Sequence, residues 1–419
     1  MSPHLATALT WAIPALAALG VIVRPLRTPE AVWAVAGAAL LVALGLVSPA
    51  RALAAVAKGA DVYLFLGGMM LLSEVARREG LFDWVAALAV NHARGSPRRL
   101  FLLVYALGVL VTALLSNDAT AVVLTPAVFA AARKAGARPL PHLFACALVA
   151  NAASFVLPIS NPANLVLYAS HVPPLGRWLT SFAAPSAVAI GATFAALRLA
   201  ERGALRGPCA GEVDQPPLSR GGFTAFAALG LTAVVMLAVS ARGWDLGLPT
   251  AVMGLLTAAM VLVRNRASPW PLLKGVSWSV LPLVAGLFVL VQAVDGAGLA
   301  EILARQLDAA IRASAGGAAW IAGGALALAC NLMNNLPAGL IASGMLARAH
   351  APPAVTDALL IGVDLGPNLS ITGSLATILW LTAIRREGQD VDFWRFLKVG
   401  AAAMPPALLL ALAARAWIF

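Results

Sequence analysis

The sequence predicts an all-α polytopic membrane protein with two inverted repeats, about ten transmembrane helices, two re-entrant hairpins and two broken helices. Three observations lead to this prediction. First, 61% of the 419 residues are hydrophobic and only 11% are charged, whereas soluble domains carry roughly 25% charged residues. Second, apolar stretches long enough to cross a bilayer recur along the chain. Third, similar polar motifs occur in both halves at a nearly constant spacing.

Ten apolar segments are long enough to cross the hydrocarbon core, which takes roughly 17–25 residues. They are 5–23, 31–49, 61–77, 142–170, 182–199, 223–241, 247–263, 276–294, 356–383 and 399–417. Two further stretches, 100–135 and 318–348, are interrupted by polar residues and proline. We interpret these two as re-entrant hairpins. The N-terminal segment lacks a basic leader region, so we interpret it as the first span and not as a cleaved signal peptide.

One long polar segment, 200–221, is rich in Gly and Pro and divides the chain, which is typical of a linker. We therefore predict a first repeat at 1–199, with hairpin 100–135 and broken helix 142–170, and a second repeat at 222–419, with hairpin 318–348 and broken helix 356–383. Asn117 in "LSNDATA" and Asn335 in "MNNLPAG" lie 218 residues apart, as do Glu74 and Gln292. Shared order and spacing indicate a duplicated unit.

The basic residues predict the orientation of the repeats. Both ends of the first hairpin are rich in arginine, which places its mouth in the cytoplasm, whereas the second hairpin has nearly neutral flanks and opens outside. With ten spans, 21 of the 29 Lys and Arg residues face inward. Each half crosses five times, so the halves are inverted, the linker is cytoplasmic and both termini are outside. In the alternative topology, with twelve spans, the hairpins cross fully and this charge symmetry is lost.

Four polar clusters near mid-membrane form the predicted substrate site. Their members are Ser116, Asn117, Asp118 and Thr120 at the first hairpin tip; Asn151, Ser160, Asn161 and Asn164 in the first broken helix; Asn334 and Asn335 at the second tip; and Asp364, Asn368, Thr372 and Ser374 in the second broken helix. Pro158 and Pro162 cannot both lie within a continuous helix, so that span must be broken. Broken helices expose unpaired backbone groups. The alternative is that these side chains only cap the helix ends.

Asp118 and Asp364 are the ionisable residues that lie deep within predicted spans, and we assign them to proton coupling. A carboxylate buried without a cationic partner takes up a proton more readily than it does in water. Binding of a cation such as Na⁺ and simple helix capping are the alternatives. Glu74 lies near a helix end, where pairing with Arg77 or Arg78 is expected. Because no Lys or Arg accompanies the two aspartates, the site suits a neutral polyhydroxyl solute or a cation better than a multiply charged anion.

The cysteines show no pattern of a disulfide framework or a zinc site. Cys146 and Cys330 lie in apolar segments, where a lone cysteine is usually a packing residue, and Cys209 lies in the linker. We predict that none is an essential ligand and that the chain holds no metal site. No phosphate-binding motif of the form G-x-x-x-x-G-K-[ST] occurs. The chain is therefore expected to be a secondary transporter that does not hydrolyse ATP, needs no cofactor and binds no nucleic acid.

The motifs "SNDATAVVLTP", "NNLP" and "GVDLGPNLSITGSLATILWL" resemble those of the bacterial arsenite/antimonite efflux permeases, the membrane component of arsenical resistance pumps. The resemblance runs from about residue 60 to residue 419, and the segment Asp364–Trp380 is its most specific part. The "SND" tip also resembles the "SNT" tips of divalent-anion/sodium symporters in the wider ion transporter superfamily. The fold of that superfamily, with inverted repeats, two hairpins and broken helices, is similar to the one predicted above.

The resemblance implies proton-coupled export of arsenite, as As(OH)₃, and of antimonite. The residues that match the family's motifs are Ser116, Asn117, Asp118, Asn334, Asn335, Asp364, Asn368, Thr372 and Ser374. Family members are taken to be proton antiporters, and some couple to a soluble ATPase on the cytoplasmic side. The related symporters are usually dimers, which leaves a homodimer open here. "SNPAN" at 160–164 departs from the family because Pro162 replaces an apolar residue.

Other functions stay open at this stage. A Na⁺/H⁺ antiporter of the same superfamily would bind sodium with its aspartates, and an anion symporter would take a carboxylate or sulfate. A passive channel would show no uphill transport, and a membrane anchor for a cytoplasmic partner would show no flux.

Overall fold

The computed structural model describes residues 2–25, 28–168, 172–215 and 217–418, and the regular elements within those ranges are helices. Seven of the described helices are long and apolar enough to cross a membrane, and two bent helix pairs raise that number to nine. Repeated apolar helices of this length are typical of a polytopic membrane protein. The predicted fold class is confirmed.

The first half of the chain contains eleven α-helices, one short π-helix and one 3₁₀ turn among the described residues. They are α1 (Pro3–Val23), α2 (Glu30–Ala43), α3 (Pro49–Lys58), α4 (Ala60–Arg78), α5 (Leu81–Ala93), α6 (Pro97–Leu114), α7 (Asn117–Ala119), the π-helix η2 (Thr120–Leu124), α8 (Thr125–Lys134), α9 (Pro139–Ala152), the 3₁₀ turn η3 (Pro158–Ser160), α10 (Pro162–Tyr168) and α11 (Leu175–Ala200).

The second half repeats this order. Its elements are α12 (Arg220–Ala241), α13 (Gly247–Arg264), α14 (Pro269–Gly275), α15 (Val280–Gly296), α16 (Leu299–Ala313), α17 (Ala315–Met333), α18 (Asn335–Leu346), α19 (Pro353–Leu365), the 3₁₀ turn η4 (Gly366–Leu369), α20 (Leu375–Arg386) and α21 (Phe393–Trp417). Corresponding helices such as α5 and α16, or α11 and α21, begin 218 residues apart. Gly80 and Gly298, which precede α5 and α16, both have positive φ, as a shared turn requires.

The two halves interlock through close helix crossings. Gly68 of α4 packs directly on the backbone of Thr250 in α13, and Gly286 of α15 packs on the backbone of Ala34 in α2. A Cβ atom at either glycine would overlap that backbone, so both crossings need a residue without a side chain. Because these glycines lie 218 residues apart, each half contributes the same close crossing to the other. The exchange joins α4 to α13 and α15 to α2.

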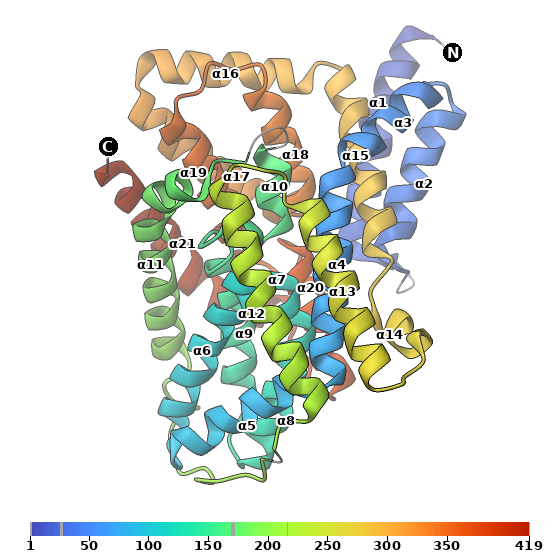
Figure 1. Ribbon diagram of the computed structural model, residues 1–419. Helices are drawn as coiled ribbons and strands as arrows, with labels where there is room; N and C mark the ends of the chain where they lie inside the picture. Colours follow the sequence, from blue (N-terminus) through green and yellow to red (C-terminus); the bar gives the residue numbers. More distant parts are fainter. Residues whose placement is uncertain (1, 26–27, 169–171, 216, 419) are drawn as a thin grey trace.

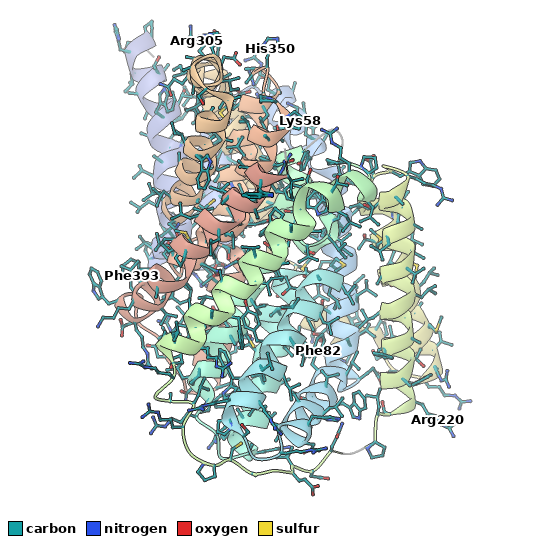
Figure 2. The ribbon with its side chains drawn as sticks, turned by 90° about the vertical axis from the view of Figure 1, so that its left-hand side faces the viewer. Lys58, Phe82, Arg220, Arg305, His350 and Phe393 are labelled. Atoms are coloured by element: carbon teal, nitrogen blue, oxygen red, sulfur yellow. The ribbon has the colours of Figure 1, made fainter. Side chains whose placement is uncertain are left out.

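Each predicted hairpin is a pair of helices that returns to the end from which it started. The first pairs α6 with α7, η2 and α8, and it opens at the bottom of Figure 1, beside the polar linker. The second pairs α17 with α18 and opens at the top. Figure 2 gives the same two ends, with Arg220 at the lower one and Arg305 and His350 at the upper one. The hairpins therefore enter the molecule from opposite ends.

Several boundaries differ from the sequence-based prediction. The second segment, predicted at 31–49, ends at Ala43, because Ser48 and Pro49 start the separate helix α3. The segments predicted at 182–199 and 276–294 correspond to α11, which starts earlier at Leu175, and to α15, which starts later at Val280. The helices α3, α5, α14 and α16 were not predicted. The last two residues of the predicted segment 142–170, and residue 216 of the linker, lie outside the described residues.

Candidate functional site

The first hairpin tip is a short break between α6 and α7. Ser116 is extended at its backbone and caps α7, because its Oγ accepts a hydrogen bond from the Ala119 N–H at 3.2 Å. The Asn117 side chain also binds the backbone, since its Oδ1 accepts a hydrogen bond from the Asp118 N–H at 2.9 Å. Both residues thus follow the capping alternative. Among the described residues, no donor or cation binds the half-buried Asp118 carboxylate, so this group stays available.

Thr120 lies inside the helix that follows the tip. Its Oγ1 is 2.8 Å from the Oγ1 of Thr112 on α6, and its carbonyl accepts from the Thr125 hydroxyl at 2.9 Å. The π-helix η2 begins at this residue, and such wide turns are common at functional sites. Thr120 therefore fixes the hairpin and is not exposed to a cavity.

A small cavity of about 50 Å³, which we name the inner cavity, lies beside the first tip. Its walls come from the tip, from α4, from the start of α10 and from the bend between α14 and α15; the polar members are Ser73, Glu74, Ser116, Asp118 and Ser277. The remaining lining is largely apolar and includes Phe65, Met69 and Pro162. The unpaired carboxylate of Asp118 is thus presented to a small space between the hairpin and the central helix α4.

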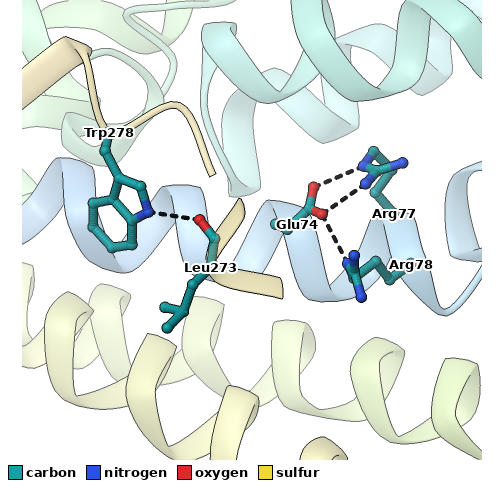
Figure 3. Close-up of polar contacts among 5 residues, drawn as sticks. All are labelled: Glu74, Arg77, Arg78, Leu273 and Trp278. Atoms are coloured by element: carbon teal, nitrogen blue, oxygen red, sulfur yellow. Dashed lines mark hydrogen bonds and ion pairs between the residues drawn. The ribbon is translucent and has the colours of Figure 1, made fainter. Parts of the chain in front are cut away.

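Glu74 lines the same cavity and forms ion pairs with two arginines. Its carboxylate accepts from Arg77 Nε at 2.7 Å and Nη2 at 2.6 Å, and from Arg78 Nε at 3.0 Å, as Figure 3 shows. The predicted pairing is therefore confirmed. Glu74 is only 5% exposed, and the bend beside it is closed by a hydrogen bond from Trp278 Nε1 to the Leu273 carbonyl. Sequence reasoning assigned Glu74 to a helix end and missed its place in the cavity.

The second hairpin tip is bound to the second broken helix. The backbone of Asn334 has a φ of 76°, which residues other than glycine rarely adopt. The Asn334 Oδ1 atom accepts a hydrogen bond from the Leu336 N–H. The Asn335 N–H donates to the Gly373 carbonyl at 2.9 Å, and the Thr372 hydroxyl donates to the Asn331 carbonyl at 3.1 Å. In the first half, the Ser160 hydroxyl similarly donates to the Ala113 carbonyl of α6. Each tip is therefore held by the broken helix of its own half.

Asn151 and Asn368 connect the two broken helices. Asn151 Nδ2 donates to Asn368 Oδ1 at 3.0 Å and to the Thr377 hydroxyl at 3.2 Å. The Ser374 hydroxyl donates to Asn151 Oδ1, and Asn368 Nδ2 donates to the Leu148 carbonyl. Asn151, Asn368 and Ser374 are fully buried. Because buried polar groups are costly unless paired, this network stabilises the crossing point of the broken helices.

Asp364 lies in the same interior, away from the inner cavity. Asn161 Nδ2 donates to its Oδ1 atom, which links the first broken helix to the end of α19. The second carboxylate oxygen, Oδ2, is buried without a partner, and so is Oδ1 of Asn164. Asn164 Nδ2 meanwhile donates to the Ser154 carbonyl. An unpaired buried carboxylate oxygen is costly, so Asp364 is a candidate for the proton coupling predicted from the sequence.

The predicted residues thus have three settings. Ser116 and Asp118 line the inner cavity. The residues that hold the hairpin tips are Asn117, Thr120, Asn334, Asn335 and Thr372, and the remaining residues of the broken helices are buried. Asp118 and Asp364 do not share the inner cavity. Thr377 was missed by sequence reasoning, although its spacing of three residues from Ser374 is typical of a helix cap.

A larger space of about 460 Å³, which we name the outer chamber, lies toward the end with the second hairpin mouth. Lys58, which lines it, lies toward that end in Figure 2. Two polar pairs border the chamber: Arg348 with Asp295 at 3.0 Å, and Lys58 with Gln292 at 3.2 Å. The Arg348 pair joins the second hairpin to α15.

A thin apolar layer separates the two spaces. On α4, Val62 lines the outer chamber and Phe65 lines the inner cavity. On α10, Leu165 lines the outer chamber and Pro162 lines the inner cavity. Three residues correspond to about 4.5 Å along a helix axis. Along both helices, less than one helical turn therefore lies between a residue of the inner cavity and a residue of the outer chamber.

The cysteines lie away from both spaces. Cys146 of α9 and Cys330 of α17 are fully buried, and neither lines the outer chamber or the inner cavity. Within the part of the chain that the structure describes, His, Cys, Asp and Glu side chains form no group of three that could hold a metal ion.

Comparisons with known proteins place this fold in a family. The family model described as citrate transporter matches residues 17–384. The chain belongs to the citrate transporter family. Among relatives, an arsenical pump membrane protein of Escherichia coli is 27% identical over 377 residues, which cover 83% of this chain and 84% of that protein. One of Yersinia enterocolitica is 27% identical over 360 residues with the same coverage. The resemblance predicted from the motifs is confirmed.

A further relative and a solved structure are also similar to this chain. An uncharacterized transporter of Mycobacterium tuberculosis is 26% identical over 370 residues, or 84% of each chain. The crystal structure of the Alcanivorax borkumensis YdaH transporter has a TM-score of 0.56 and 16% identity, and it covers 88% of this chain and 87% of that one; this likeness concerns the fold alone. Family and helices together identify a multi-pass membrane transporter and not an enzyme.

Proposed function

We propose that the protein exports arsenite, as uncharged As(OH)₃, and antimonite, in exchange for protons. The observation that carries this proposal is the unpaired Asp118 carboxylate at the small inner cavity. The names of relatives with 27% identity support arsenic as the cargo. A small polar solute suits a cavity of about 50 Å³ better than a large carboxylate does.

In the proposed cycle, hydroxyl and amide groups hold the three hydroxyls of As(OH)₃. Ser116 and Asp118 line the cavity directly, and a small movement of the hairpin against α4 exposes Asn117 and the second tip. Asp118 and Asp364 exchange protons with the two sides, and no cysteine is required. The apolar layer between Val62 and Phe65 opens and closes alternately, by elevator-like or rocking motion. Such alternating access is usual for inverted-repeat transporters.

Protons can drive this export through both the pH gradient and the membrane potential. Exchange of one inward proton for a neutral solute moves one charge, which is worth about 2.3 kcal/mol per 100 mV. That energy corresponds to a concentration gradient of roughly fiftyfold. Secondary transport of this kind needs no nucleotide and no cofactor.

The decisive experiment is arsenite uptake into everted membrane vesicles with an imposed proton gradient and with no ATP or Na⁺. Accumulation that collapses with an uncoupler is expected. Absence of accumulation with intact protein in the vesicles would contradict autonomous proton coupling. Addition of Na⁺, or of a soluble arsenical-pump ATPase, then separates sodium coupling from an obligatory partner.

The family description favours a second candidate, a carboxylate symporter. Against it, the inner cavity presents two carboxylates, and its nearest arginines already pair with Glu74. Citrate, succinate and sulfate should therefore fail to raise the thermal unfolding temperature, whereas a clear rise with any of them would favour the symporter. A Na⁺/H⁺ antiporter would show Na⁺-dependent proton flux without arsenite.

The setting of this activity is part of the same proposal. We infer a bacterial inner membrane, with the basic linker end in the cytoplasm and both termini outside. A homodimer is expected from the related symporters. Accessibility labelling of single cysteines at Arg220 and His350, on opposite ends in Figure 2, tests the orientation.

A further inference from the structure

A third cavity, of about 430 Å³, lies apart from the inner cavity and the outer chamber, where the start of α6 meets the end of α11. We name it the arginine pocket. Arg98, Arg198 and Arg202 line it together with Phe194, Leu199 and Leu205. We propose that the arginine pocket binds the head group of an anionic phospholipid.

The three arginines of the arginine pocket form no ion pair with the described residues. Among the described residues, no carboxylate pairs with Arg98, Arg198 or Arg202, and all three are exposed. Glu201 adjoins the pocket in sequence, but it does not line the cavity and its charge interacts with Arg395. Three guanidinium groups around one cavity repel one another unless an anion lies between them. Guanidinium groups bind phosphate with two parallel hydrogen bonds.

The apolar wall of the pocket selects a lipid over a free phosphate. Phe194 and Leu199 belong to α11, and Leu199 is 66% exposed. Both α6 and α11 are long and apolar enough to span a membrane, so their outer faces meet acyl chains. Arg98 is the second residue of α6, where free backbone N–H groups add to the attraction for an anion. The arginines can therefore bind the phosphate of the head group, while the apolar faces of α6 and α11 beside them contact the acyl chains.

The position of the pocket fits the same ligand. It lies at the end of the molecule that carries the linker and the first hairpin mouth, where basic residues gather. Basic pockets between membrane helices at such an end bind anionic head groups. This inference depends on the membrane-spanning fold and is independent of which solute is transported.

The test compares two triple variants that lose the same charge. The pocket variant carries Arg98→Gln, Arg198→Gln and Arg202→Gln, and the control carries Arg220→Gln, Arg264→Gln and Arg266→Gln, which are exposed arginines outside the pocket. Thermal unfolding in neutral detergent is followed during titration with phosphatidylglycerol, phosphatidylcholine or inorganic phosphate. Phosphatidylglycerol should raise the unfolding temperature of wild type and control, and the pocket variant should need on the order of 100-fold more of it.

Two results would overturn the proposal. Equal responses of the pocket and control variants would remove the arginine pocket as the site, and an equal response of wild type to inorganic phosphate would make it a small-anion site. Leu199→Asn keeps the three charges and should weaken the response to phosphatidylglycerol but not to phosphate. If the triple variant does not fold, Arg202→Gln alone, examined by native mass spectrometry, should retain less phosphatidylglycerol than Arg266→Gln, and equal retention would again contradict the assignment.

Discussion

Asn151 donates a hydrogen bond from Nδ2 to Oδ1 of Asn368 at 3.0 Å, and this contact joins the two broken helices, which come from different halves of the chain. Both side chains are fully buried. The same amide of Asn151 reaches Thr377, and its oxygen accepts from Ser374. The contact therefore acts as the central connection between the halves, behind the hairpin tips.

Removal of this connection should destabilise the protein. Asn151→Ala leaves the Asn368 Oδ1 atom buried without its donor and removes one contact of the Ser374 hydroxyl, which keeps Thr377 as a partner. An unpaired buried group costs about 1–3 kcal/mol. We expect a clearly lower thermal unfolding temperature. Thr382→Ala is the control, because its hydroxyl donates to the Ile378 carbonyl within one helix. An Asn151→Ala variant as stable as Thr382→Ala would show that the network adds little.

Asp118→Asn should abolish proton-coupled export and leave folding intact. The carboxylate binds no donor among the described residues, so the amide loses no protein contact, but it can no longer carry a proton. Arsenite uptake into everted vesicles with an imposed proton gradient measures the loss. Asp214→Asn in the exposed linker is the control. Full gradient-driven uptake by Asp118→Asn would exclude this residue from coupling.

Much of the fold could be predicted from sequence because the bilayer imposes strong constraints. Apolar length located the spans, and paired arginines at both ends of 100–135 located a hairpin mouth. The residues around Pro158 and Pro162 predicted a break, and the structure has Pro162 at the first position of α10, where its missing N–H is not needed. The departure "SNPAN" is thus compatible with a broken helix.

The division of the site could not be predicted in the same way. The sequence grouped Asp118 with Asp364 because both lie deep within predicted spans, but whether a side chain faces a cavity depends on which helix packs in front of it. Asp364 is buried and accepts a hydrogen bond from Asn161, which lies 203 residues away. Glu74 was missed because its place in the cavity depends on the bend at Gly275, which lies beside the Glu74 carboxylate. No local sequence pattern indicates that Gly275 and Glu74 lie close together.

Gly275→Ala should disturb the wall of the inner cavity. A Cβ atom at this position would overlap the Glu74 carboxylate, so the Glu74 side chain or the bend must move, at a cost of about 1–3 kcal/mol. We expect reduced export together with a lower unfolding temperature. Gly230→Ala is the control, since no atom lies within 4 Å of its added Cβ. Equal behaviour of the two variants would contradict the close approach.

Replacement of all three cysteines by alanine should preserve arsenite export. Cys146 and Cys330 are buried in helices and line neither the inner cavity nor the outer chamber, so their loss removes only packing contacts. A thiolate complex would also hold arsenic too tightly for release. Uptake into everted vesicles, normalised to the amount of folded protein, is the measurement. A loss of export that single restoration of Cys330 reverses would make that thiol a ligand.

Phe65→Leu should make the apolar layer leak. Phe65 is fully buried and lines the inner cavity, three residues along α4 from Val62 in the outer chamber. Loss of the ring opens space at the point where the inner cavity and the outer chamber are separated by about 4.5 Å along the axis of α4. We expect faster downhill arsenite flux without a proton gradient and a smaller gradient at steady state. Phe82→Leu, a buried phenylalanine of α5 outside both spaces, is the control, since it loses similar packing. Equal passive flux through the two variants would place the barrier elsewhere.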